Sequence, residues 1–163
     1  FTEDGFFRTG DAGYIKNGEL FLTDRIKDLF KTSNGKYIAP QMIESLLLVD
    51  KFIDQVVVIA NERKFVSALI VPEFRLVEEW AKDHGVEFET REDLCANAKV
   101  NKMMMDRIQT LQQQLAHYEQ IKRFTLIAHH FSMESGELTN TLKIRRPVIY
   151  KNFKEVIDKM YEE

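Results

Sequence analysis

Three short stretches of this chain carry side chains that could do chemistry, and the first is Thr9-Gly10-Asp11-Ala12-Gly13. Its glycines let the backbone turn sharply or come close to a ligand, and they flank one carboxylate. Asp11 could accept two hydrogen bonds from the diol of a sugar, or it could be a turn residue that bonds its own backbone. The residues alone leave both interpretations open.

The second stretch is the charged run from Asp24 to Asp28, in which Ile26 is the only apolar residue. Arg25 offers a planar fork that fits phosphate oxygens, although it could also form a surface ion pair worth at most ~1 kcal/mol. Lys27 lies in a run without Gly or Pro, and a hinge needs only a position that can absorb a change in φ and ψ. The run is therefore either a functional connector or a solvated loop.

An Asn34-Gly35 pair follows the charged run and separates two short strand-like segments. This dipeptide predicts a hairpin with positive φ at both residues. Gly35 could let a thin ligand pass close to the hairpin, or the turn could require it only for the backbone angle. Spacing does not separate these possibilities.

The third stretch is LTNTLKIRR, from Leu138 to Arg146, in which Lys143 stands between two apolar residues. A lysine here could act as a point charge for a phosphate whose negative charge grows in a transition state. The alternative is a plain basic patch formed with the two arginines that follow. His129 and His130 have no third ligand at metal spacing, so we expect no metal site, and we interpret Cys95 as an inert thiol.

Composition places few limits on function. The chain has 163 residues, 44% hydrophobic and 30% charged, with a net charge of −3, which fits one globular domain without a general attraction to nucleic acid. A single cysteine fits a reducing compartment, and no stretch approaches the ~18 apolar residues of a membrane span. We expect a cytoplasmic location. Because the chain begins at Phe1 inside a patterned segment, we interpret it as a piece of a longer protein.

Hydrophobic periodicity predicts an α+β fold in which a β-hairpin precedes a sheet of roughly three strands covered by helices. A first hairpin is expected at 14–23, around Asn17-Gly18. The β-branched run 53–60 and the run 65–71 should be antiparallel neighbours, with 124–128 as a third strand. Helices are predicted at 40–49, 74–84, 90–98, 100–120 and 147–160.

Taken together, the motifs resemble one family. FFRTGDAGY, LTDRIKDLFKTSNGKYIAPQMIE and GELTNTLKIRR are similar to the last three sequence blocks of adenylate-forming enzymes, and their wording is nearest to long-chain fatty acyl-CoA ligases. The match covers residues 6–44 and 136–146 directly, and the order of elements between them also fits the family's C-terminal domain. The combination of the three blocks is far more specific than any one of them.

The resemblance implies a role for each candidate residue. Asp11 would hold the ribose hydroxyls of ATP and acyl-AMP, and Arg25 would contact ribose or phosphate. Lys27 would be the hinge, where the family usually has Asp or Lys. Lys143 would be the mobile lysine that contacts the α-phosphate and the acid carboxylate, and many members carry Gly where Leu142 stands.

The resemblance also implies a second set of contacts, to coenzyme A. Gly35, with Lys36 beside it, would line the pantetheine tunnel in the thioester-forming state. Residues 1–23 would be the tail of a large N-terminal adenylation domain, and 24–163 a C-terminal lid that swivels on it. The partners would be that domain, a fatty acid, ATP and coenzyme A. ATP and Mg²⁺ would be held mainly by the missing domain, so the fragment alone is expected to be inactive.

Two alternatives stay open at this point. The acceptor could be a carrier protein instead of coenzyme A, although KTSNGKYIAP looks like the acyl-CoA ligases. The chain could instead be a non-enzymatic interaction module, with the polar 100–120 helix facing a partner. The whole enzyme could also associate with membranes peripherally through its substrate, but no segment here would anchor it.

Overall fold

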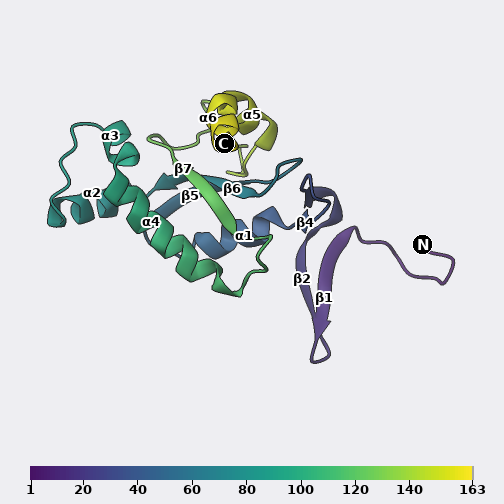
Figure 1. Cartoon of the computed structure of the whole chain (residues 1–163). Helices are drawn as coiled ribbons and strands as arrows, with labels where there is room; N and C mark the ends of the chain where they lie inside the picture. Colours follow the sequence, from purple (N-terminus) through teal and green to yellow (C-terminus); the bar gives the residue numbers. More distant parts are fainter. Residues whose placement is uncertain (163) are drawn as a thin grey trace.

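The computed structural model of the chain describes residues 1–162, apart from the side chains of Thr23 and Asp24. Two small hairpins precede a three-stranded sheet, and the first hairpin projects away from the rest of the molecule (Figure 1). The strands are β1 (Asp11–Lys16), β2 (Glu19–Arg25), β3 (Phe30–Lys31), β4 (Tyr37–Ile38), β5 (Ile53–Ile59), β6 (Val66–Pro72) and β7 (Ile121–Leu126).

Helices cover both faces of the three-stranded sheet. In Figure 1, α5 and α6 lie on one side of it and α1 and α4 on the other. The helices are α1 (Pro40–Leu47), α2 (Phe74–Asp83), α3 (Arg91–Ala96), α4 (Ala98–Leu111), α5 (Arg146–Asn152) and α6 (Lys154–Lys159), with single 3₁₀ turns η1 (Ile26–Asp28) and η2 (Gln112–Gln114). The predicted α+β class, with a hairpin and a three-stranded sheet, is confirmed.

The central strand β6 explains why the core sits where it does. It pairs antiparallel with β5, as predicted, and parallel with β7, so that Ala68 lies opposite both Val58 and Phe124. All seven residues of β6 are buried. A strand covered on both faces needs a nearly continuous apolar run, and VSALIVP provides it.

The first hairpin forms for the reason that the sequence predicts. Asn17 and Gly18 have φ angles of 53° and 83°, which the two-residue hairpin turn requires. Gly13 allows β2 to approach closely, because a Cβ at this position would overlap the carbonyl oxygen of Phe21. Asp11, which the sequence left as a possible turn residue, is the first residue of β1.

The second hairpin differs from its prediction. Only Gly35 has a positive φ, of 77°, and the loop spans residues 32–36. The Gly35 amide donates to the Thr32 carbonyl (2.9 Å), and the Thr32 hydroxyl accepts from the Lys36 amide (3.1 Å). The Asn34 side chain instead donates to the Lys64 carbonyl (3.3 Å). These bonds hold a wider loop than the predicted two-residue turn.

The helix predicted at 100–120 is too long. The α-helix ends at Leu111 and η2 ends at Gln114. Gln112 is 5% exposed, and a buried amide needs hydrogen-bond partners. It finds them on one residue of β7, because the Ile121 amide donates to its Oε1 (2.8 Å) and its Nε2 donates to the Ile121 carbonyl (3.2 Å). This pairing accompanies the reversal of the chain into the third strand.

Other boundaries move by a few residues or split an element. The predicted helix 90–98 is α3, with Thr90 as its N-cap in a capping box with Asp93. The predicted helix 147–160 is two helices, α5 and α6, separated at Phe153. That ring is buried between His129 and Phe131, with ring centroids 5.7 and 5.6 Å away. The third strand begins at Ile121, earlier than expected.

A buried ion pair joins α1, β5 and the start of α5. The Arg146 Nη2 donates to the Glu44 Oε2 at 2.8 Å, and the two side chains are 21% and 10% exposed. The Val58 amide donates to the other carboxylate oxygen (2.8 Å), and Arg146 donates to the Val58 carbonyl (3.4 Å). The pair therefore occupies backbone groups at the edge of β5 that a further strand would otherwise use.

The end of the chain is tied to the turn between β5 and β6. Asp158 accepts hydrogen bonds from Arg63 and Lys154, both at 2.7 Å. The Tyr161 hydroxyl lies 2.6 Å from the Ser67 hydroxyl and donates to backbone carbonyls of the same turn. Burial raises the pKa of Tyr161 to about 12, so this hydroxyl remains a donor at neutral pH.

Removing the cation of the buried pair should destabilise the fold strongly. Arg146→Met leaves the Glu44 carboxylate buried without its charged partner, so we expect a loss of about 3 kcal/mol in the free energy of unfolding. Urea unfolding of the 163-residue chain measures it. The control is Lys102→Met in the exposed Lys102–Asp106 pair, which should cost less than ~1 kcal/mol. Equal losses would contradict the role assigned to Arg146.

The Asp158 contacts should appear in the acid dependence of stability. Hydrogen bonds from Lys154 and then Arg63 hold the pKa of Asp158 below its usual value of 3.8. A carboxylate with a lowered folded-state pKa stabilises the fold above its unfolded pKa, and this contribution disappears as the pH falls through the folded pKa. Asp158→Asn should therefore lower the urea midpoint at pH 7, by a margin that shrinks below about pH 4. The control Glu155→Gln, on the same helix, should show no such trend.

Candidate functional site

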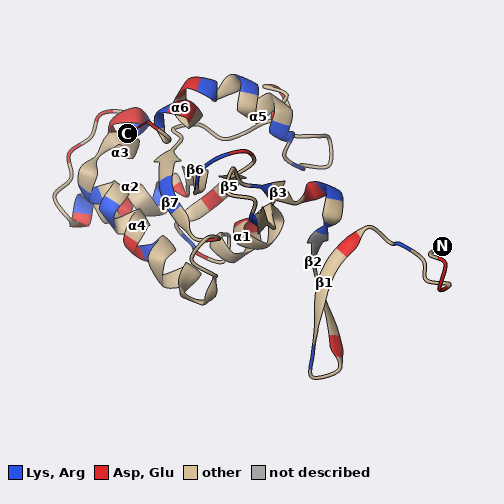
Figure 2. Ribbon diagram, turned by 45° about the vertical axis from the view of Figure 1, so that its right-hand side comes forward, with Lys and Arg blue, Asp and Glu red and all other residues tan. Residues whose placement is uncertain are grey.

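Four of the predicted site residues line one surface pocket. Asp11, Arg25, Lys27 and Lys143 all contribute to a pocket of about 540 Å³. Leu22, Asp28 and Gln41 complete its lining. Figure 2 shows acidic and basic residues close together where the hairpin β1–β2 joins the rest of the chain. Residues from the two ends of the sequence therefore meet at one place.

The hairpin presents Asp11 and Arg25 together. Asp11 opens β1 and Arg25 closes β2, and the two are cross-strand partners. The Arg25 Nε lies 3.9 Å from the Asp11 Oδ1, with the side chains 65% and 33% exposed. Arg25 therefore does form a surface ion pair, and Asp11 is one partner in it. Such an exposed pair is worth at most ~1 kcal/mol, so a ligand can replace it at little cost.

Lys27 lies in the single turn η1, between the first hairpin and β3. The turn contains no buried residue, and its flanking residues Arg25 and Leu29 are both extended (ψ 138° and 136°). Its closing bond, from the Leu29 amide to the Ile26 carbonyl, measures 3.4 Å. The Ile26 amide also donates to the Gly10 carbonyl (2.8 Å), so the connector lies outside the core and is bonded to the start of the first hairpin.

A tight turn presents Lys143 at the surface. The Thr139 amide donates to the Lys143 carbonyl (2.8 Å), and the Thr139 hydroxyl accepts from the Lys143 amide (3.0 Å). A bridge between Leu138 and Ile144 closes the turn. The Lys143 side chain is exposed and lines the pocket.

Leu142 has an unusual backbone conformation, with a φ of 59°. A left-handed conformation costs a residue with a Cβ roughly 1–2 kcal/mol and costs glycine nothing. This position is the one at which the resemblance expects glycine. The geometry of the turn therefore gives a physical reason for glycine before the lysine, and shows that leucine can adopt the same conformation.

A second hollow, of about 720 Å³, continues from the first pocket and shares Lys27, Asp28, Gln41 and Lys143 with it. Glu44 and Arg146 belong to its wall, and the Arg146 guanidinium lies 5.2 Å from the centre of the Phe30 ring. The basic-patch interpretation is therefore wrong for Arg146, because its charge is paired internally. The internal pairing of Arg146 could have been inferred from Glu44, which lies on the buried face of α1, because a buried carboxylate requires a cation nearby.

Sequence reasoning also missed Gln41, in the first turn of α1. This helix starts with Pro40, and its N-cap Ala39 makes no side-chain capping bond. The first amides of a helix have no partner within the helix and favour negative charge nearby. Pro40 predicted a helix start here, and from that start a contribution of α1 to an anion site could have been inferred.

Gly35 and Lys36 are not brought to either of these hollows. Gly35 lies exposed in the β3–β4 loop, and a Cβ added to it would meet no atom within 4 Å. The Lys36 Nζ lies 5.4 Å from the centre of the Tyr118 ring. A role for these two residues in binding a pantetheine arm stays a prediction.

Other candidates have structural partners. His130 lies 3.3 Å from Asp54 and His129 stacks on Phe153, so the two histidines face different neighbours. In the described part of the chain, no three His, Cys, Asp or Glu side chains are placed to hold a metal ion. Burial raises the pKa of the Cys95 thiol to about 11, which keeps it protonated at neutral pH. Within residues 1–162, no helix has the length and apolarity to cross a bilayer.

Comparison with known proteins identifies the family. Residues 27–163 match the AMP-binding enzyme C-terminal domain. The chain belongs to this family, and the resemblance inferred from the three motifs is confirmed.

The relatives include long-chain fatty acid ligases. The chain is 36% identical to human long-chain-fatty-acid–CoA ligase 1 and 34% identical to the peroxisomal long chain acyl-CoA synthetase 7 of Arabidopsis thaliana, in each case over 98% of its length. It spans 23% of the length of each of these relatives. The activity of a whole ligase therefore involves much more polypeptide than this chain.

Solved structures share the fold. The adenylation domain of a carboxylate reductase from Mycobacterium chelonae aligns with a TM-score of 0.75 and 25% identity, over 100% of this chain and 24% of that one. A fatty acyl CoA synthetase from Mycobacterium tuberculosis aligns over 95% of this chain and 26% of its own, with a TM-score of 0.56 and 21% identity. The arrangement of helices and strands is thus that of a known C-terminal domain.

Replacing Leu142 by glycine should stabilise the chain. The substitution removes the left-handed strain, while the greater freedom of glycine in the unfolded chain offsets part of the gain, so we expect an increase of ~0.5–1 kcal/mol in the free energy of unfolding. Little burial is lost, because Leu142 is 68% exposed. In urea unfolding, the neighbouring control Asn140→Gly, at a residue without positive φ, should be destabilising. A loss of stability in Leu142→Gly would contradict the strain argument.

Proposed function

We propose that this chain is the mobile C-terminal lid of a long-chain fatty acid–CoA ligase. Residues 24–163 form the lid, and residues 1–23 are the end of the large adenylation domain. The observation that carries the proposal is the meeting of Asp11, Arg25, Lys27 and Lys143 at one pocket. The names of the relatives support a fatty acid as the substrate and coenzyme A as the acceptor.

The surface of the first hairpin supports a large domain as the partner of this chain. Residues 1–26 carry a concentration of exposed apolar side chains, which a lone soluble domain rarely presents. They are Phe1, Phe6, Phe7, Tyr14, Ile15, Leu20, Phe21, Leu22 and Ile26. In Figure 1 the hairpin stands clear of the helices that cover the sheet. Packing against the adenylation domain would remove this apolar surface from water.

The side chains of the pocket suit the ribose and phosphate of ATP. The Asp11 carboxylate can accept hydrogen bonds from both hydroxyls of a ribose, and Arg25 and Lys143 supply positive charge for phosphate oxygens. A related carboxylic acid reductase from Segniliparus rugosus has been solved in complex with AMP. The carboxylates of the pocket are Asp11 and Asp28, too few to hold Mg²⁺ alone, so we assign the metal to the adenylation domain.

The proposed reaction has two steps. A carboxylate oxygen of the fatty acid attacks the α-phosphorus of ATP, so that an O–P bond forms and pyrophosphate leaves. Negative charge grows on the phosphate oxygens in this step, and Lys143 stabilises it. The coenzyme A thiol, losing its proton, then attacks the acyl carbonyl of acyl-AMP, and AMP leaves with the bonding electrons.

The lid must move between the two steps. The space that Lys143 occupies during adenylation is needed by the incoming thiol, so we propose that the lid turns about Lys27. This turn would withdraw Lys143 and bring Gly35 and Lys36 toward the pantetheine arm. The exposed η1 turn supports this role, because it can change conformation without opening the core. We place the enzyme in the cytoplasm, with peripheral membrane contact through its substrate.

The other interpretations make different predictions for the full-length protein. A carrier-protein acceptor requires transfer of the acyl group to a phosphopantetheinyl protein, whereas we expect transfer to free coenzyme A. The alternative of a non-enzymatic interaction module rested on a long helix predicted at 100–120. The helix is shorter in the structure, because α4 ends at Leu111. To distinguish the two acceptors, full-length protein is incubated with fatty acid and ATP and then with each thiol in turn, and formation of the acyl thioester is measured. The 163-residue chain alone should form no acyl-CoA.

Lys143→Ala should separate the two half-reactions. In the full-length enzyme we expect adenylate formation, followed by pyrophosphate release, to slow by about 10²-fold or more, as for loss of one electrostatic catalyst. Thioester formation from supplied acyl-AMP and coenzyme A should stay within about twofold of wild type, because the lysine has left the site by then.

The matched control is Lys151→Ala, which removes an exposed lysine on α5 outside the pocket. It should leave both half-reactions unchanged. Circular dichroism and the urea midpoint establish that both variants fold. Equal slowing of both half-reactions by Lys143→Ala would remove the role that we assign to this residue.

A further inference from the structure

A second candidate site, separate from the pocket of Asp11 and Lys143, lies along the edge strand β7. A pocket of about 590 Å³ is lined by four consecutive residues of this strand, Lys122 to Thr125. Successive side chains of a strand point to opposite faces of the sheet. A pocket that all four reach therefore runs along the open edge of the sheet. None of its lining residues belongs to the pocket of Asp11 and Lys143.

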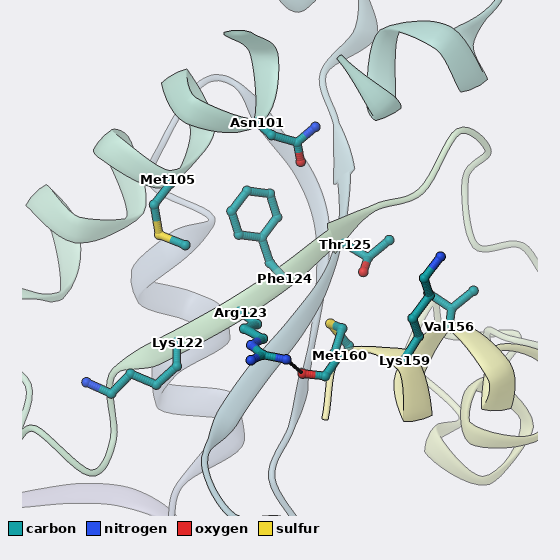
Figure 3. Close-up of a pocket in the computed structure, with 9 residues that line it drawn as sticks. All are labelled: Asn101, Met105, Lys122, Arg123, Phe124, Thr125, Val156, Lys159 and Met160. Atoms are coloured by element: carbon teal, nitrogen blue, oxygen red, sulfur yellow. Dashed lines mark hydrogen bonds between the residues drawn. The ribbon is translucent and has the colours of Figure 1, made fainter. Parts of the chain in front are cut away.

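Helices flank this edge on both sides, as Figure 3 shows. Asn101 and Met105 reach the pocket from α4, and Val156 and Lys159 reach it from α6, with Met160 directly after that helix. The edge of β7 therefore forms the floor of a groove with a helix along each wall.

The two edges of the sheet differ in whether side chains bond their outward-facing backbone groups. On β5, Glu44 and Arg146 occupy the amide and carbonyl of Val58. On β7, no hydrogen bond joins the backbone of residues 122–125 to anything but β6 in the described chain. One edge is closed by side chains, and the other keeps backbone donors and acceptors for a further strand.

The groove combines apolar walls with positive charge. Met105, Phe124, Val156 and Met160 supply its apolar surface, and no acidic side chain lines it. Lys122 and Lys159 contribute ammonium groups. Arg123 is engaged elsewhere, since it donates to the carbonyls of Met160 (2.8 Å) and Glu162 (2.7 Å). This local positive charge contrasts with the net charge of −3 of the chain.

We propose that the β7 groove binds an extended peptide segment of a partner protein that carries both acidic and apolar side chains on each of its two faces. The segment adds to the sheet as a strand beside β7, and its backbone pairs with the free edge. Side chains on one face of the segment lie near Met105, Phe124 and Lys122 on the α4 side of the edge (Figure 3). Those on the other face lie near Val156, Met160 and Lys159 on the α6 side, because strand side chains alternate. Each side of the groove therefore offers apolar surface and one lysine.

Two other occupants fit the groove less well. A second copy of this chain, pairing β7 with β7, would bring Lys122 and Lys159 of both copies together, and lysines on an edge strand oppose such self-pairing. A fatty acid anion would match the apolar surface and the ammonium groups. It would leave the backbone donors and acceptors of the edge without partners.

The test uses the 163-residue chain and synthetic nine-residue peptides followed by fluorescence anisotropy. A peptide of glutamate, valine and isoleucine, with glutamate and apolar residues on both faces of the strand, should bind with a Kd on the order of 10–100 μM, as expected for a small interface. The same peptide with lysine in place of each glutamate should bind at least ~10-fold more weakly, because its charges repel Lys122 and Lys159. Backbone N-methylation at alternate positions should abolish binding for one set of positions and be tolerated for the other.

Charge reversal identifies the groove. Lys122→Glu and Lys159→Glu should each weaken binding by about 10-fold, as for a lost charge pair at an interface, whereas the exposed lysine control Lys151→Glu should not. Addition of the peptide should slow amide hydrogen exchange within residues 122–125. Equal binding of the lysine peptide, equal loss in Lys151→Glu, or equal tolerance of both N-methylated sets would overturn the proposal. So would a concentration-dependent dimer lost in Lys122→Glu, or binding of decanoate with no binding of the peptide.

Discussion

The ion pair between Glu44 and Arg146 is the constraint on which much of this structure depends. Two charges that are largely removed from water must satisfy one another, and here they also bind the backbone of Val58. One interaction therefore joins α1, the edge of β5 and the start of α5. The turn that carries Lys143 ends directly before Arg146, so its position follows from this buried contact. The Glu44–Arg146 pair thus helps to fix where the exposed Lys143 lies.

The candidate site combines this rigid anchor with a weakly held partner. Lys143 comes from the body of the domain, while Asp11 and Arg25 come from a hairpin that is joined to it through the short η1 turn. The Asp11–Arg25 ion pair lies within the hairpin, so it does not tie the hairpin to the body of the domain. In the proposed function, the hairpin and the body separate while each keeps its own charged groups. An enzyme that needs one lid to serve two reaction steps requires this combination of firm local placement and weak attachment.

Much of the fold could be predicted because its signals are local. Asn17-Gly18 encodes its turn, Pro40 marks a helix start, and the β-branched run after Phe52 encodes a buried strand. The errors arose where a distant residue decided the outcome. Gln112 ends its helix where it pairs with Ile121, and Asn34 bonds Lys64 instead of forming the predicted turn. In each case a polar group found its partner in another element, which no periodicity reveals.

The sequence by itself determined the family and the chemical types of the candidate residues, because both are written in short runs of neighbouring side chains. Only the tertiary structure decided which of them share a pocket. It brought Asp11, Arg25, Lys27 and Lys143 together, and it left Gly35 and Lys36 elsewhere. It also removed Arg146 from the basic patch and closed one sheet edge while leaving the other open. The physical reason is that buried polar groups must be satisfied, and their partners are chosen by the packing of the whole chain and not by sequence proximity.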